Sequence, residues 1–179
     1  MANKLASSGQ TQIIGKSDIQ ALPQADWNKL NARPGPLAEV WTFDGELLNA
    51  VTFYTGIPGG KPLLREVDKK NRPLPKFAKD MLLPDLPSFL ERTYRITKDV
   101  STFNVEQVAP GTVAGHKGVA FSYTFVGSDD VRRKGEANAA IIDGKLYLVT
   151  YEAPLIYFYD NSKDQYHQLL QSLTKGKSK

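Results

Sequence analysis

The chain contains one clear hairpin signal. Asp143 and Gly144 separate two long runs, 133–142 and 145–152, that are rich in apolar residues. A two-residue turn of type I′ needs positive φ at both central positions, and Asp-Gly suits it for that reason. The segment therefore predicts two adjacent antiparallel strands, and any fold proposed for this chain has to contain them.

Other segments have the composition or alternation of strands. They lie at 39–44, 47–54, 102–108 and 119–126. In the last of these, Val119, Phe121 and Tyr123 fall on one face of the predicted strand, since successive side chains point to opposite sides. Short links join most of these strands, and strands joined by short links must be antiparallel.

Three segments predict helices. The spacing of apolar residues favours a helix over 85–97, in which Asp85 is expected to cap the first amides. A final helix is expected over 162–174, and a short one over 77–83. Together the elements predict an α+β domain, in which a central antiparallel sheet is flanked by helices as an α/β/α sandwich.

The domain limits follow from composition. Residues 1–25 are rich in Ser, Gln and Gly, and we expect a flexible N-terminal lead-in there. Residues 26–173 are expected to form a single domain, and 174–179 a basic tail. The formal charge of +4 resides in these two ends, because removing them leaves equal numbers of basic and acidic residues. A neutral domain argues against a nucleic-acid partner.

The sequence has no apolar segment that approaches the roughly 20 residues needed to span a bilayer. The first residues, MANKLASSGQ, contain no apolar core of a signal peptide. Two interpretations stay open: the protein is cytoplasmic, or its sequence begins after a leader that has been removed.

Catalytic candidates are few. His116 and His167 are the two histidines, and neither has a partner at metal-ligand spacing. Asp129 and Asp130 are adjacent, so on a strand they would point to opposite faces. A hydrolase that uses His116 with Asp129 or Asp130 is the least favoured hypothesis. We expect no catalytic site, no metal site and no cofactor, and therefore no enzyme.

Two features favour binding. The first is the Pro- and Gly-rich segment 56–76, which is either a functional loop or a surface excursion around one sheet edge. The second is the tyrosine cluster on both sides of Pro154, which is either core or part of a binding groove. The predicted contact residues lie near these two features: Tyr54, Arg65, Arg95, Tyr151 and Glu152.

Four runs of the sequence carry a resemblance to a known family. They resemble bacterial envelope lipoproteins of unknown function, and they are WNKL, AEVWTFDGELLNAVTFYTGIPGGKPL, KKNRPLPKF and RRKGEANAAIIDGKLYLVTYEAP. Their fold is similar to the superfamily of the photosystem II extrinsic subunit PsbP and a Ran-binding nuclear import factor. The resemblance covers residues 26–173. It implies a PsbP-like fold and a location in the periplasm or at the outer membrane.

The resemblance also implies a function. We expect a non-catalytic cell-envelope binding or adaptor protein whose partner is an unknown envelope protein. The alternative is a small-molecule carrier with an aromatic-lined pocket. Contact with the membrane is expected only through a lipid anchor. The chain has no cysteine to accept a lipid, so the lipid-accepting cysteine would belong to a leader that precedes Met1.

Overall fold

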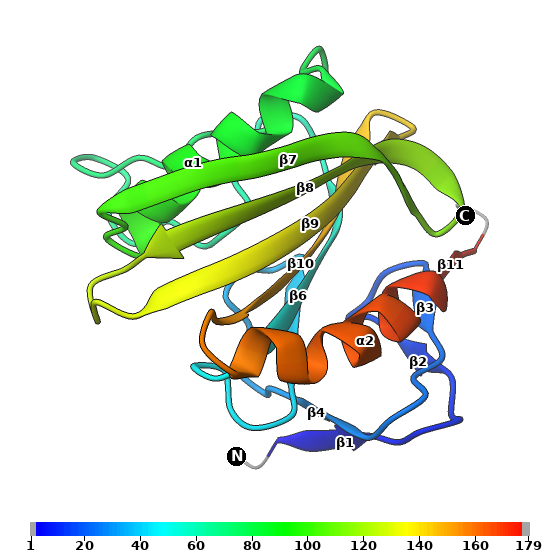
Figure 1. Cartoon of the computed structure of the whole chain (residues 1–179). Coiled ribbons are helices and arrows are strands. Elements are labelled where there is room, and N and C mark those ends of the chain that lie inside the picture. Colours follow the sequence, from blue (N-terminus) through cyan, green and yellow to red (C-terminus); the bar gives the residue numbers. More distant parts are fainter. Residues whose placement is uncertain (1–2, 177–179) are drawn as a thin grey trace.

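A computed structural model describes residues 3–176. Its centre is an antiparallel sheet of eight strands in the order β1-β4-β5-β6-β10-β9-β8-β7 (Figure 1). The strands of this sheet are β1 (Lys4–Ala6), β4 (Trp27–Lys29), β5 (Ala38–Thr42), β6 (Ala50–Ile57), β10 (Lys145–Pro154), β9 (Arg132–Ile142), β8 (His116–Val126) and β7 (Thr102–Val113). A second sheet contains β11 (Thr174–Lys175), β3 (Ile19–Ala21) and β2 (Gln12–Ile13). The helices are the single 3₁₀ turn η1 (Leu83–Asp85), α1 (Leu86–Thr97) and α2 (Phe158–Gln171).

The predicted hairpin is confirmed. β9 and β10 pair in register from Lys145 opposite Ile142, and Asp143 and Gly144 have φ of 53° and 75°. Both values are positive, as a type I′ turn requires. The hairpin lies within the sheet, because β10 also pairs with β6 and β9 also pairs with β8.

Alternate residues of β10 belong to two hydrophobic cores. Leu146 and Leu148 belong to a first core, which also contains residues of α1 such as Phe89 and Leu90. Tyr147 and Tyr151 belong to a second core, which also contains residues of α2 such as Tyr166. The two cores lie on opposite faces of the sheet, because neighbouring side chains of a strand point to opposite faces. The tyrosines of β10 are therefore core residues.

The start of α1 differs from the expectation. Asp85 stands at the N-cap, but its side chain makes no capping hydrogen bond to the helix and instead accepts one from the amide of Leu82 at 3.0 Å. The short helix expected over 77–83 is also absent from the described chain, where only η1 precedes α1. Its first residue is engaged elsewhere, since the amide of Phe77 donates to the carbonyl of Lys61 at 2.9 Å.

The N-terminal segment is built into the fold, contrary to the expectation of a flexible lead-in. β1 pairs with β4, and β2 and β3 form a small sheet with β11. Ala6, Ile14 and Ile19 are buried in the second core. Ala21 is buried in the same core, and Lys175 of β11 forms an ion pair with Asp18 at 2.8 Å.

The last helix begins earlier than expected, at Phe158, directly after Tyr157 with φ of 74°. The predicted basic tail over 174–179 is described only in part, because 177–179 lie outside the described residues; its first two residues form β11. None of the helices in residues 3–176 is both long and apolar enough to cross a membrane.

Candidate functional site

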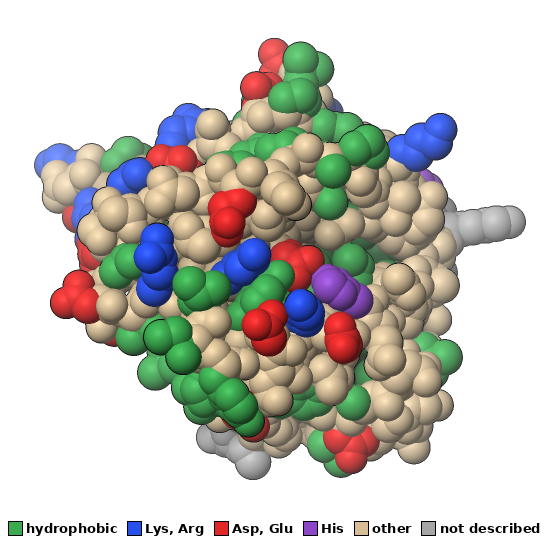
Figure 2. Space-filling view, in the orientation of Figure 1, with side chains coloured by type: hydrophobic (Ala, Val, Ile, Leu, Met, Phe, Trp, Pro, Cys, Tyr) green, Lys and Arg blue, Asp and Glu red, His purple; other side chains and the backbone are tan. Residues whose placement is uncertain are grey.

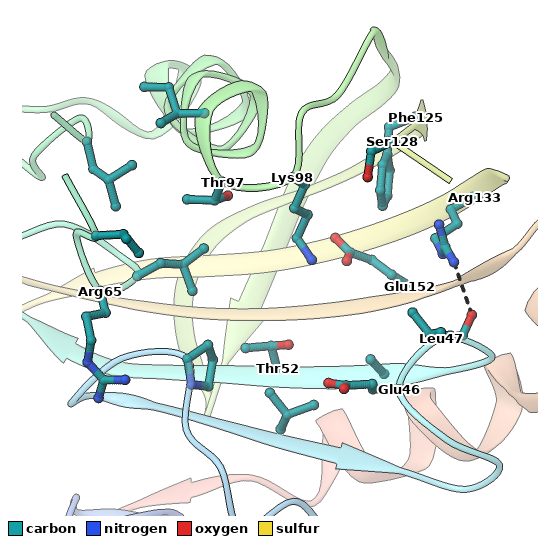
Figure 3. Close-up of a pocket in the computed structure, with 18 of the residues that line it drawn as sticks. Glu46, Leu47, Thr52, Arg65, Thr97, Lys98, Phe125, Ser128, Arg133 and Glu152 are labelled. Atoms are coloured by element: carbon teal, nitrogen blue, oxygen red, sulfur yellow. Dashed lines mark hydrogen bonds between the residues drawn. The ribbon is translucent and has the colours of Figure 1, made fainter. Parts of the chain in front are cut away.

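An open cleft of about 940 Å³ lies on the first-core face of the sheet (Figure 3). Its floor comes from β5, β6 and β10, through residues such as Thr52 and Glu152. One wall is the end of α1 with Lys98, and another is the Pro- and Gly-rich loop with Arg65. The cleft therefore lies where this loop and the sheet meet.

A buried carboxylate forms part of the cleft floor. Glu152 is 8% exposed, and its Oε2 accepts hydrogen bonds from the hydroxyls of Tyr94 and Tyr123, each at 2.5 Å. Tyr94 comes from α1 and Tyr123 from β8, so two other elements hold this carboxylate of β10. Hydrogen bonds to an ionised acceptor are short and strong, which fixes the carboxylate in place.

Gly135 makes this arrangement possible. In the sheet register, Gly135 of β9 lies opposite Tyr123 on one side and opposite Glu152 on the other. A Cβ atom at position 135 would lie 2.3 Å from two ring carbons of Tyr123. The tyrosine ring therefore lies across the glycine and reaches the carboxylate two strands away.

The same environment changes how the tyrosines ionise. Burial raises the pKa of Tyr94 and of Tyr123 well above the usual value, and the negative charge of Glu152 raises each further. Burial and then Glu152 also raise the pKa of Tyr54, which lines the cleft, although the Tyr94 hydroxyl opposes this shift. The phenols of Tyr94 and Tyr123 stay protonated and donate to the carboxylate.

The two oxygens of the Glu152 carboxylate differ in their hydrogen-bond partners. Within residues 3–176, Oε1 of Glu152 has no hydrogen-bond or ion-pair partner. Figure 3 shows Lys98 and Glu152 turned toward the same part of the cleft. The Lys98 ammonium lies 4.8 Å from the centre of the Tyr94 ring, and no ion pair joins it to Glu152 in the described chain. A carboxylate oxygen and an ammonium group are thus both available to a ligand.

One end of the cleft is held by an ion pair. The Arg133 guanidinium contacts both carboxylate oxygens of Asp129, at 3.0 and 2.8 Å, and lowers the pKa of that carboxyl. It also donates to the carbonyl of Leu47 at 3.4 Å, the dashed line in Figure 3. This contact ties the turn before β6 to the turn before β9.

The five predicted contact residues separate into two groups. Tyr54, Arg65 and Glu152 line the cleft. Tyr151 does not, because it is fully buried in the second core, where its hydroxyl donates to the carbonyl of Tyr159 at 2.7 Å. Arg95 also lies outside the cleft, on α1, where it forms an ion pair with Glu91 at 2.9 Å.

Sequence reasoning missed Tyr94, Tyr123, Lys98 and Gly135. Tyr94 and Tyr123 follow apolar patterns that indicate only a buried face. Their pairing with Glu152 joins residues 58 and 29 positions apart. The one available signal was the glycine within the predicted strand, since a strand glycine often marks the close approach of another group.

The least favoured hypothesis, a hydrolase built on His116, meets an obstacle in the fold. His116 begins β8, whereas Asp129 and Asp130 follow the end of that strand. At about 3.3 Å per residue, the strand separates them by on the order of 30 Å. His167 lies on α2, where its Nε2 contacts Glu136 at 2.9 Å. Among the described residues, no three His, Cys, Asp or Glu side chains form a group that could hold a metal ion.

The face of the molecule that carries α2 also has charges of both signs. Figure 2 shows basic and acidic side chains interspersed on the face that carries α2 and the outer strands, without a field of one sign. Several of them are paired, including Lys163 with Asp160 at 3.2 Å and His167 with Glu136.

Comparison with solved structures gives the fold a context. A solution structure of cyanobacterial PsbP (CyanoP) from Synechocystis sp. PCC 6803 is similar with a TM-score of 0.57 at 15% identity, over 98% of this chain and 93% of that chain. A crystal structure of LpqN, involved in cell envelope biogenesis of Mycobacterium tuberculosis, gives a TM-score of 0.37 at 10% identity, over 96% and 89%. No protein-family model matches the sequence. No curated protein sequence matches it either. The likeness to PsbP shows that this chain has a PsbP-like fold, as the sequence resemblance implied, and at this identity it shows the fold alone.

Proposed function

We propose that this chain is a non-catalytic binding protein of the bacterial cell envelope and that its ligand occupies the cleft beside Glu152. The observation that carries the proposal is the open cleft of about 940 Å³ whose floor presents a buried carboxylate, one oxygen of which has no partner within residues 3–176. Binding sites are typically concave and carry a small number of well-placed polar groups among apolar ones.

The proposal includes a place in the cell and an arrangement of layers. The sequence resemblance to envelope lipoproteins supports a periplasmic or outer-membrane-associated protein, anchored through a lipid on a leader. We also infer the α/β/α sandwich. It is supported by the separation of α1 and α2 into different cores on residues of alternate parity in β10.

The ligand can be a segment of an envelope partner or a small molecule. The volume of the cleft favours the second candidate, a small-molecule carrier, because ligand pockets usually measure about 300–1,000 Å³. In such a carrier the aromatic contribution to the site would come from Tyr54 and Phe125, which line the cleft. Tyr151 would support it only as part of the scaffold.

Site-specific photo-cross-linking tests the proposal. The sequence has no cysteine, so a single Thr52→Cys variant can carry a photoreactive group at one position in the cleft. A matched control is Thr124→Cys, since Thr124 is also a half-buried strand threonine but alternates with the first-core residues of β8. Each labelled protein is incubated with envelope extract, irradiated and analysed by mass spectrometry.

We expect an adduct of defined mass at position 52 and none at position 124. The adduct mass distinguishes a protein segment from a small molecule. Filling the cleft with Thr52→Trp should remove the ligand from protein purified out of the same extract. Equal adducts at both positions, or none at position 52, would contradict the proposal.

A further inference from the structure

The two buried glutamates of the described chain differ in how their oxygens are used. Glu39 lies on the opposite face of the sheet, where Oε2 accepts from the Trp41 indole at 3.1 Å and Oε1 lies 3.8 Å from the Arg33 guanidinium. Glu152 has both of its tyrosine donors on Oε2. Glu152 lines the cleft, and its Oε1 has no hydrogen-bond or ion-pair partner within residues 3–176. A buried charge that is only partly satisfied is costly to hold, so an external donor that pairs with this oxygen would stabilise the carboxylate.

The charges around the cleft favour a ligand that carries both a positive and a negative charge. Basic and acidic side chains line it in equal number: Arg65, Arg72, Lys98, Arg133, Glu46, Asp68, Asp129 and Glu152. Several of them already have partners within the protein, as Arg133 has in Asp129 and Arg72 has in Asp99, at 3.1 Å. The inner floor presents Glu152, and Lys98 extends toward it from the end of α1 (Figure 3).

A simple ion does not match this pair. A cation placed at Glu152 would meet the ammonium of Lys98, and an anion placed at Lys98 would meet the carboxylate of Glu152, so each is opposed by a like charge. A ligand that carries an ammonium and a carboxylate satisfies both groups at once. The hydrogen bonds would be charge-assisted at each end, which is the stronger class.

We propose that the cleft binds a zwitterionic ligand of the amino acid or short-peptide class. The ligand's ammonium donates to Oε1 of Glu152, and its carboxylate accepts from the Lys98 ammonium. The inference rests on the proposed function, since it names the ligand class for the same cleft. A volume of about 940 Å³ leaves room for apolar side chains against Val40, Leu64 and Phe125.

The test uses peptides that differ by one charge. Trileucine with free termini, N-acetylated trileucine, trileucine amide and free leucine are titrated into the full chain, and backbone amide shifts are followed by NMR. We expect free trileucine to shift amides that line the cleft, such as those of Thr52, Lys98 and Gly127, until saturation. Acetylation or amidation should each weaken binding roughly tenfold or more, since each removes one charge-assisted hydrogen bond.

Two variants assign each end of the ligand. Glu152→Gln should remove the advantage of free over acetylated trileucine, and Lys98→Gln should remove the advantage of free over amidated trileucine. The matched controls are Glu39→Gln, which changes a buried glutamate of the opposite face, and Lys117→Gln, which changes an exposed lysine outside the cleft. Both controls should bind free trileucine as the unmodified protein does.

The outcomes distinguish a free amino acid from a short peptide, and they decide whether the proposal holds. Free leucine binding as tightly as trileucine assigns a free amino acid, and binding of trileucine alone assigns a short peptide. Equal binding of free and acetylated trileucine, or no response to any of the four compounds, overturns the zwitterion proposal. If the adduct at position 52 still forms in that case, the cleft stands as the binding site and only the ligand class is wrong.

Discussion

At the scale of single residues, the site depends on a glycine that is not part of it. Gly135 separates Tyr123 from Glu152 in the sheet, and the absence of a side chain there lets the tyrosine hydroxyl reach Oε2 at 2.5 Å. The contact could not be read from the sequence. The position of Tyr151 could have been, because it is adjacent to Glu152 on a strand and must point to the opposite face.

We expect Gly135→Ala to destabilise the protein although alanine normally suits a strand better than glycine. The new methyl group would lie 2.3 Å from the Tyr123 ring, and overpacking of this kind costs about 1–3 kcal/mol. Urea unfolding measures the change in the free energy of unfolding.

A double-mutant cycle identifies the cause. In a Tyr123→Ala background the ring is gone, so Gly135→Ala should cost much less than in the unmodified protein. An equal cost in both backgrounds would show that the glycine is required for another reason than the tyrosine.

At the scale of elements, the sequence predicts long strands and helices well and short ones poorly. β8, β9 and β10 are long and alternate clearly, so their existence and pairing could be predicted. β1, β2 and β3 have two or three residues each. Their pairing depends on distant partners, including β11 at the other end of the chain, so local pattern carries no signal for it.

Two adjacent isoleucines test whether the N-terminal segment belongs to the domain. Ile14 is 0% exposed in the second core, whereas Ile13 is 56% exposed. Ile14→Ala should lower the free energy of unfolding by about 2–5 kcal/mol, because it removes buried methyl groups and leaves a cavity. Ile13→Ala should change it by no more than about 0.5 kcal/mol.

Chemical unfolding of both variants gives the two values. Both variants replace an isoleucine by alanine at neighbouring positions, so the type of substitution cannot explain a difference in the free energy of unfolding. If both substitutions had the same small effect, residues 1–25 would be a lead-in without a structural role.

At the scale of the whole molecule, the buried tyrosines make the stability of the protein depend on pH. The pKa values of Tyr94 and Tyr123 are raised by burial and then by the charge of Glu152, relative to a usual value of 10.0. A group whose folded pKa lies above its unfolded pKa contributes stability that is complete below the unfolded value. That stability is lost as the pH rises, since the unfolded chain releases the proton first.

We therefore expect the contribution of these two tyrosines to the free energy of unfolding to be constant below pH 10 and to fall above it. Urea unfolding at a series of alkaline pH values measures the slope, and tyrosinate absorbance reports ionisation. A variant with Tyr94→Phe and Tyr123→Phe should show a smaller slope. Ionisation of both phenols near pH 10 in the folded protein would contradict the assignment.

The order of strands has a consequence for how this chain is made. β6 has β5 on one side and β10 on the other, yet β10 is the last strand of the large sheet to leave the ribosome. Pairing between segments so distant in sequence is slow to form, and the first half of the sheet has an open edge until it does. Synthesis must be nearly finished before the sheet can close.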